Sequence, residues 1–162
     1  MATKKGNIDL SKVLHLNPSL EMNKPEKKRY YIGIDCGVNT GFAIWDSQEK
    51  KFTNIATIKI HTALFWIKLN TDLSNCKIIV EDARKRKWYG KDSEQKQQGA
   101  GSVKRDCKIW EDFLTEIGAD FVMVHPIKGG TKIDKERFKK ITGWNLSTSS
   151  HSRDASLLVF QK

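Results

Sequence analysis

The stretch that decides the fold is YYIGIDCGVNTGFAIWD, residues 30–46. It holds a short apolar run that ends at Asp35, a turn that contains Gly37 and Gly41, and a second apolar run. A third apolar run follows at 52–58. Short turns between β-rich runs favour antiparallel pairing. The pattern therefore predicts an antiparallel meander of three strands, at 30–34, 42–46 and 52–58.

Downstream of the meander, helical and strand patterns alternate. Helices are predicted at 61–73, 103–117 and 154–160, with a short basic helix around 138–141, and strands at 76–80 and 119–124. This order predicts an α/β fold in three layers, with a mixed five-stranded sheet (antiparallel meander, then parallel strands) flanked by helices. It is the order expected of a ribonuclease-H-like fold, although other three-layer folds share it.

Length and charge narrow the class of protein. The 162 residues suit one domain, here 30–162, preceded by a basic and partly flexible arm at 1–29. The formal net charge is +10, which favours a polyanionic partner. No apolar run is long enough for a membrane span and no secretory signal is visible. Three cysteines without a CxxC pair favour a reducing, cytoplasmic setting.

Acidic side chains stand where two strands end. Asp35 ends the first apolar run, and Glu81 and Asp82 follow the fourth. Asp154 is expected to open the last helix, with His151 three residues before it. Neighbouring strand ends share one sheet edge, and residues at i and i+3 share one helix face, so we expect these groups to meet.

A cluster of carboxylates repels itself and calls for a cation. Oxygen ligands with little nitrogen favour Mg²⁺ or Mn²⁺, and two such ions form an arrangement that hydrolyses phosphodiesters. We therefore expect two Mg²⁺ ions, held by Asp35, Glu81, His151 and Asp154, which are also the predicted catalytic residues. Side chains alternate across a strand, so only one of Glu81 and Asp82 can face the site. Glu81 is preferred and Asp82 is the alternative.

Basic segments carry the predicted DNA contacts. Five cations surround two aromatic side chains just after Glu81, a second group lies at 128–140, and a third is expected to open the helix at 103–117. Cations bind phosphates, and aromatic rings stack on bases. The predicted DNA-binding residues are Arg84, Lys85, Arg86, Lys87, Trp88, Tyr89, Lys91, Lys104, Arg105, Lys128, Lys132 and Lys135.

Three motifs together resemble the RuvC-type Holliday junction resolvases. They are Tyr31-Ile32-Gly33-Ile34-Asp35 with its glycine turn, the apolar strand into Glu81, and His151-Ser152-Arg153-Asp154-Ala155. The turn 39–43 is most similar to phage-borne members. The resemblance covers about 30–160 and implies a ribonuclease-H-like fold, metal-binding carboxylates at Asp35, Glu81 and Asp154, and a homodimer that nicks four-way DNA junctions with Mg²⁺. It places Lys128 and Lys135 near the scissile phosphate.

The chain departs from the bacterial pattern of that family. Cys36 stands where proline is usual, and the turn to Gly41 is one residue shorter. The loop after Glu81 is more basic, which predicts cleavage of branched DNA beyond four-way junctions. Two alternatives stay open: an RNA–DNA hybrid nuclease of the same fold, and a non-catalytic DNA-binding module.

Overall fold

The computed structural model describes residues 27–85, 93–126 and 133–162 and contains a five-stranded mixed sheet. The strands are β1 (Tyr30–Asp35), β2 (Asn39–Asp46), β3 (Lys51–Lys59), β4 (Cys76–Glu81) and β5 (Phe121–Val124), in the order β3-β2-β1-β4-β5. The pairs β1–β2 and β2–β3 are antiparallel, whereas β1–β4 and β4–β5 are parallel. The predicted meander followed by parallel strands is confirmed.

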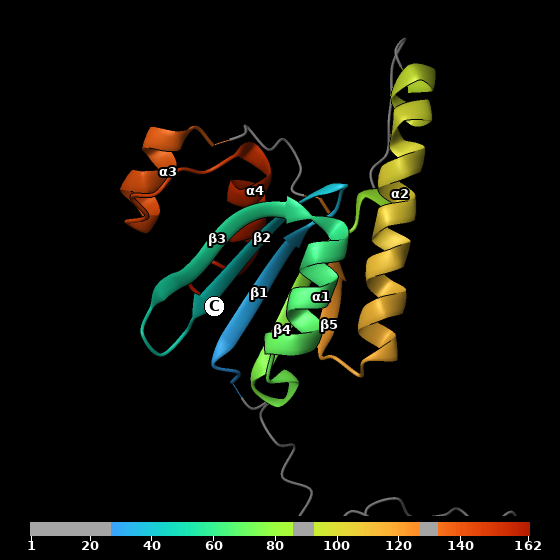
Figure 1. The fold of residues 1–162 in the computed structure, drawn as a ribbon. Helices are drawn as coiled ribbons and strands as arrows, with labels where there is room; N and C mark the ends of the chain where they lie inside the picture. The colour runs from blue at the N-terminus through green and yellow to red at the C-terminus, as the bar shows by residue number, and fades with distance from the viewer. Residues whose placement is uncertain (1–26, 86–92, 127–132) are drawn as a thin grey trace, which may run out of the picture.

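Helices cover both faces of the sheet (Figure 1). They are α1 (Ile60–Asn70), α2 (Ser93–Glu116), α3 (Lys135–Thr142) and α4 (Ser150–Val159), with single 3₁₀ turns η2 (Leu73–Asn75) and η3 (Ala83–Lys85) on either side of β4. The α1 and α2 helices lie on one face and α4 on the other. The predicted α/β class, with a mixed five-stranded sheet flanked by helices, is therefore confirmed, and it is compatible with the predicted three layers.

Alternation along the strands divides the core in two. Ile32 and Ile34 of β1 and Ile78 and Val80 of β4 point to the α1–α2 face, where they pack with Trp110 and its neighbours. The opposite cluster joins Ala43, Trp45 and Ile79 to Phe138, Ala155 and Val159 of α3 and α4. Because successive side chains of a strand alternate between faces, these two clusters fix the side to which each strand-end residue points.

Two glycines let α4 approach the sheet closely. A Cβ atom added at Gly41 would overlap the carbonyl oxygen of His151 and lie 2.5 Å from its carbonyl carbon. A Cβ atom at Gly33 would overlap the carbonyl oxygen of Ala155 in the same way. The backbone of α4 therefore rests directly on β1 and β2, and its first turn lies beside the carboxyl end of β1.

Two predicted helix starts are wrong. The long helix begins at Ser93, not at Val103, so Lys104 and Arg105 lie in its interior and the expected phosphate site at its N-terminus is not there. The last helix begins at Ser150, with Ser149 as its N-cap in a capping box with Ser152, so Asp154 lies inside the helix and does not open it. His151 and Asp154 still belong to one helix, at i and i+3.

Three further findings bear on the predictions. All three cysteines are free and buried. No helix in the described part of the chain has the length and apolar character that crossing a membrane requires. The predicted arm at 1–29 lies outside the described residues except for its last three positions, where the Arg29 guanidinium pairs with the buried Asp46 carboxylate at 3.0 Å.

Candidate functional site

The candidate site begins where β1 and β4 end. These two strands are parallel and pair in register, so that Asp35 lies opposite Glu81. The residues before them, Ile34 and Val80, are fully buried on the α1–α2 face. Asp35 and Glu81 therefore both point to the α4 face, as neighbours on adjacent strands. This is the juxtaposition that the strand-end pattern predicted.

His151 joins these strand ends from the first turn of α4. Its Nδ1 atom lies 2.8 Å from Oδ2 of Asp35. The Asp35 side chain is 16% exposed and the imidazole is 48% exposed, so the pair stands at the surface and water reaches it. Ser149 caps the helix through the backbone N–H of Ser152, which holds the turn that carries His151.

The contact between His151 and Asp35 orients the imidazole ring. When Nδ1 carries the proton, it donates to Asp35 Oδ2 and leaves Nε2 as the acceptor. When both nitrogens are protonated, the same contact becomes an ion pair. A carboxylate that accepts from one ring nitrogen fixes the orientation of the ring and the role of the other nitrogen. The geometry is therefore that of an oriented histidine at a sheet edge.

Asp154 lies one turn further along α4 and is half-buried. Among the described residues, no three His, Cys, Asp or Glu side chains form a group placed to hold a metal ion. The structure thus brings together Asp35 with His151, and Asp35 with Glu81 through strand register. It does not gather these three with Asp154 into a preformed set of ligands.

Asp82, the alternative to Glu81, points to the opposite face of the sheet. It is 2% exposed and accepts from Arg84 through both carboxylate oxygens, at 2.7 and 3.0 Å. These hydrogen bonds hold the pKa of Asp82 below its usual value, although burial acts in the other direction. Arg84 also donates to Glu111 of α2 at 2.7 Å. Asp82 therefore belongs to a group of ion pairs that joins the end of β4 to α2, on the other face of the sheet from His151.

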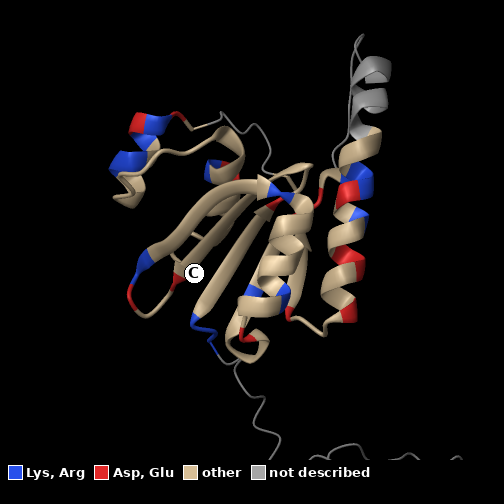
Figure 2. Cartoon of the chain, in the orientation of Figure 1, with Lys and Arg blue, Asp and Glu red and all other residues tan. Residues whose placement is uncertain are grey.

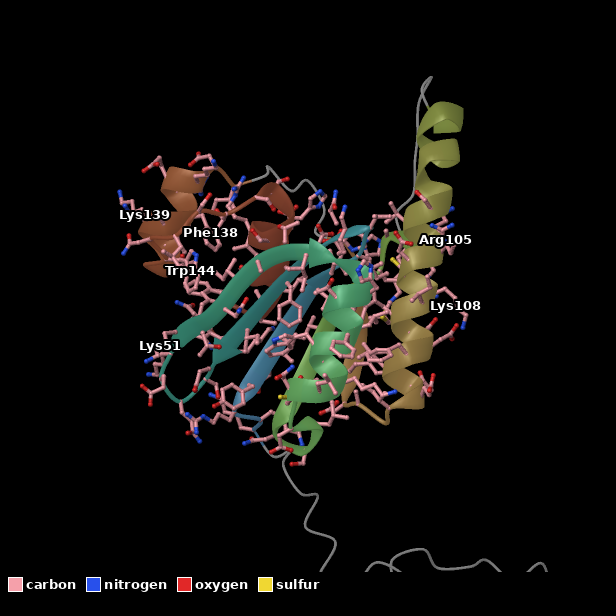
Figure 3. All side chains as sticks on the ribbon, viewed as in Figure 1. Lys51, Arg105, Lys108, Phe138, Lys139 and Trp144 are labelled. Atoms are coloured by element: carbon pink, nitrogen blue, oxygen red, sulfur yellow. The ribbon has the colours of Figure 1, made fainter. Side chains whose placement is uncertain are left out.

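The same contacts change the interpretation of Arg84. Its guanidinium is paired with two carboxylates, so we do not include Arg84 among the proposed DNA contacts. Lys85 donates to the Met123 carbonyl and is half-exposed. Lys104, Arg105 and Lys135 are exposed, and Figure 3 shows Arg105 and Lys108 pointing away from the sheet. The other predicted contacts lie outside the described residues: Arg86, Lys87, Trp88, Tyr89, Lys91, Lys128 and Lys132.

Sequence reasoning missed a structural arginine beside the site. Arg153 is 8% exposed, and its guanidinium donates to the carbonyl oxygens of Ile133, at 2.8 Å, and Thr148, at 3.1 Å. It thereby ties α4 to the segment that leads into α3. One arginine within a helical pattern gives no sign of such a role in the sequence, because its two closest acceptors are main-chain atoms.

The residue types at the strand ends suit a hard divalent cation. Two carboxylates in register on adjacent strands offer the oxygen ligands that Mg²⁺ and Mn²⁺ prefer, and one histidine nitrogen lies beside them. No family model and no curated protein matches this chain.

Proposed function

We propose that this protein is a Mg²⁺-dependent, structure-selective endonuclease that cuts four-way (Holliday) or otherwise branched DNA, in DNA recombination or repair or in phage DNA processing. The observation that carries the proposal is the strand-end constellation: Asp35 and Glu81 in register on one face, with His151 on the Asp35 carboxylate. The sheet order and the three layers are compatible with a ribonuclease-H-like fold, which we include in the proposal.

Asp35 and Glu81 would be the main metal ligands, with Asp154 and His151 completing the set. Bound Mg²⁺ or Mn²⁺, two ions in the proposed site, supplies charge neutralisation at the scissile phosphate and lowers the pKa of a water molecule. The two strand-end carboxylates fit that role because the register of β1 and β4 keeps them side by side. Without a cation they would repel each other at neutral pH.

His151 would position a water proton. The contact with Asp35 fixes the ring so that its second nitrogen can accept a proton from an attacking water, or give one to the leaving oxygen. The carboxylate also stabilises the ring when it becomes charged. Because the imidazole is about half-exposed, a phosphate backbone at the sheet edge can reach it.

Charge and symmetry complete the proposal. The chain carries a net charge of +10, which favours a polyanionic substrate. Two symmetric nicks in a four-way junction need two active sites related by a twofold axis, so we propose that the active form is a homodimer. Cytoplasmic DNA, of a bacterium or of an infecting phage, would be the substrate.

The experiment compares Asp35→Asn with the parent on a labelled four-way junction in Mg²⁺. We expect nicking to fall by roughly 100-fold or more, the range that loss of a positioned catalytic group costs. DNA affinity should change little. Asp120→Asn is the matched control, because Asp120 is an exposed carboxylate that pairs with Lys77, away from the strand ends.

The outcomes of this experiment distinguish the proposed nuclease from its alternatives. Nicking retained in Asp35→Asn removes this residue, and the proposal with it. No nicking by the parent, with junction binding intact, means a DNA-binding module. Parallel incubation with a flap and an RNA–DNA hybrid gives the substrate: faster cleavage of the hybrid than of any branched DNA contradicts the proposed selectivity.

A further inference from the structure

The α3 helix is a cationic surface outside the strand-end site. Its eight residues hold four cations against one acid, and all five of these side chains are exposed. They are Lys135, Glu136, Arg137, Lys139 and Lys140. Figure 2 shows this short basic segment on the α4 side of the sheet. A shallow hollow on the same helix is lined by Asp134, Glu136, Arg137, Lys139 and Lys140.

These cations differ from several others in the described residues. Arg29, Lys77, Arg84 and Lys108 each pair with a carboxylate within 3.0 Å. Within the described residues, by contrast, the four cations of α3 make no ion pair. Paired charges contribute little to binding a polyanion, since part of their field is already cancelled. The α3 helix therefore presents a concentrated positive charge to solvent.

The helix is held firmly in place. Phe138 is 1% exposed and belongs to the cluster beneath α4, with its ring 6.5 Å from that of Phe52. Asp134 caps the first turn by accepting from the Arg137 N–H at 2.8 Å. Figure 3 shows Phe138 on the inner side of the helix, near Trp144, and Lys139 on the outer side. The cations thus stand on a fixed support.

The same helix is tied to the candidate site. Ile133, two residues before α3, accepts from Arg153, and Arg153 directly precedes Asp154. The start of α3 is therefore joined to the helix that carries His151 and Asp154. An α-helix rises about 1.5 Å per residue, so α3 extends about 12 Å from that point.

We infer that α3 binds the sugar–phosphate backbone of a duplex arm next to the cleaved phosphate; this rests on the proposed function. One DNA strand carries a phosphate every 3.4 Å or so along the axis, so a helix about 12 Å long spans about three or four of them. Side chains three and four apart on a helix are neighbours, which puts Lys135 beside Lys139 and Arg137 beside Lys140. Cations in such rows on a fixed helix suit a regular row of phosphates and carry no base readout.

An acidic protein segment is the other possible occupant. It would be expected to use the exposed apolar side chains that follow the cations, Ile141 and Leu146, which are 45% and 71% exposed. The backbone of DNA is favoured because four cations, none of them paired with a described carboxylate, stand within eight residues on a helix joined to the site. Leu146 lies beyond α3, in the connection to α4.

The test measures the salt dependence of DNA affinity for the full-length chain in EDTA, with four-way junction and linear duplex, from 50 to 200 mM KCl. The variant is Arg137→Gln/Lys139→Gln/Lys140→Gln. Each phosphate that the variant no longer neutralises should lower the slope of log Kd against log salt by about 1, so we expect a fall of about 2 to 3 on both DNAs. Melting temperatures of parent and variant establish that both are folded.

The control removes the same charge elsewhere, as Lys28→Gln/Lys68→Gln/Lys77→Gln. These lysines lie at the other end of the sheet, where β1 and β4 begin and α1 ends. Their removal should leave the slope within about 0.5 of the parent, since they would contact no phosphate.

Equal slopes for the α3 variant and the parent would overturn the inference, as would equal decreases for the α3 and control variants. Nicking at saturating DNA is a separate measurement: the parent's failure to nick would defeat the proposed function, while the slope comparison would still decide the role of α3.

Discussion

The contact between Gly41 and His151 makes a sharp test of the site. In Gly41→Ala the new methyl group would lie 2.5 Å from the carbonyl carbon of His151. Two carbon atoms in van der Waals contact stand about 3.5 Å or more apart, so the two backbones must separate by about 1 Å. The Asp35–His151 hydrogen bond, 2.8 Å long, would then stretch beyond the range of a hydrogen bond.

The expected effects follow from that displacement. Forcing an extra methyl group into a well-packed contact costs about 1–3 kcal/mol. For a chain of this size we expect the melting temperature to fall by about 4–8 °C at 2 kcal/mol. A misplacement of about 1 Å at a reacting group can cost roughly 100-fold in rate. Nicking should therefore fall much more than the decrease in stability alone would produce.

The assay is single-turnover nicking of a four-way junction, well below the melting transition, beside Gly33→Ala. That second variant places its methyl group against Ala155, 3.0 Å from its carbonyl carbon, further along α4 than His151. It should lose similar stability and keep more activity. Equal nicking rates for the two variants at equal melting temperatures would refute the argument that the first turn of α4 positions His151.

Three further substitutions test the contacts that hold α2 and α4 against the sheet. Arg84→Gln leaves the buried Asp82 carboxylate without its main partner and should cost about 2–3 kcal/mol in urea unfolding at pH 7. The pKa of Asp82 is lowered in the folded state. The stabilisation by Arg84 is therefore complete above the unfolded pKa of about 4 and is lost as the pH falls through the lower folded pKa. If Arg84→Gln lowered the free energy of unfolding as much at pH 2.5 as at pH 7, the pairing of Arg84 with ionised Asp82 would be contradicted. Leu114→Ala, at a fully buried position on the inner face of α2, should cost about 3 kcal/mol by the same measurement, and a cost below about 1 kcal/mol would mean that α2 is not packed there. Ser149→Ala removes the N-cap of α4 and should cost about 1 kcal/mol by thermal melting, with a larger decrease in nicking than Ser74→Ala, a substitution in η2 beside the β4 start.

The strands could be predicted because their signals are local. Apolar runs that end abruptly at Asp35 and Glu81 mark both the strand and its edge of the sheet. The choice between Glu81 and Asp82 could not be made from the strand pattern, because alternation shows only that the two side chains point to opposite faces of the sheet. The position of α2 and the Arg84 contact show that Asp82 is the one on the α1–α2 face.

The errors occur where helices begin without an apolar pattern. The residues 93–102 are polar, with two glycines, so the apolar pattern predicts the α2 helix only from Val103. At α4 the sequence predicts a start at Asp154, because a Ser-rich stretch does not show which serine caps. In the structure Ser149 accepts from Ser152, an S-x-x-S pair where the usual capping box has Glu or Gln at the fourth position.

The contact that defines the site joins residues 116 positions apart, and no local pattern gives a distance between them. Its partners could be predicted only as residue types that an enzyme would place at a sheet edge. In the same way, the pairing of Arg84 with Glu111 depends on α2 lying against β4, so the sequence alone cannot separate this structural arginine from the cations around it.

The three buried cysteines allow the opening of the core to be measured by chemical labelling. Cys36 directly follows Asp35, and Cys107 of α2 lies against the Glu81 carbonyl at 3.7 Å. The hydrogen bond with Cys107 and then burial raise the pKa of the Cys36 thiol, and burial raises the pKa of Cys76 to about 11. The hydrogen bond with Cys36 lowers the pKa of Cys107, so the protection of this sulfur comes from burial alone. Alkylating reagents must reach a sulfur and attack its thiolate, so Cys36 and Cys107 stay protected while α2 covers them. The rate at which iodoacetamide modifies Cys36 and Cys107 would then count how often α2 lifts from the sheet, and a substrate that tightens the strand ends would slow that labelling.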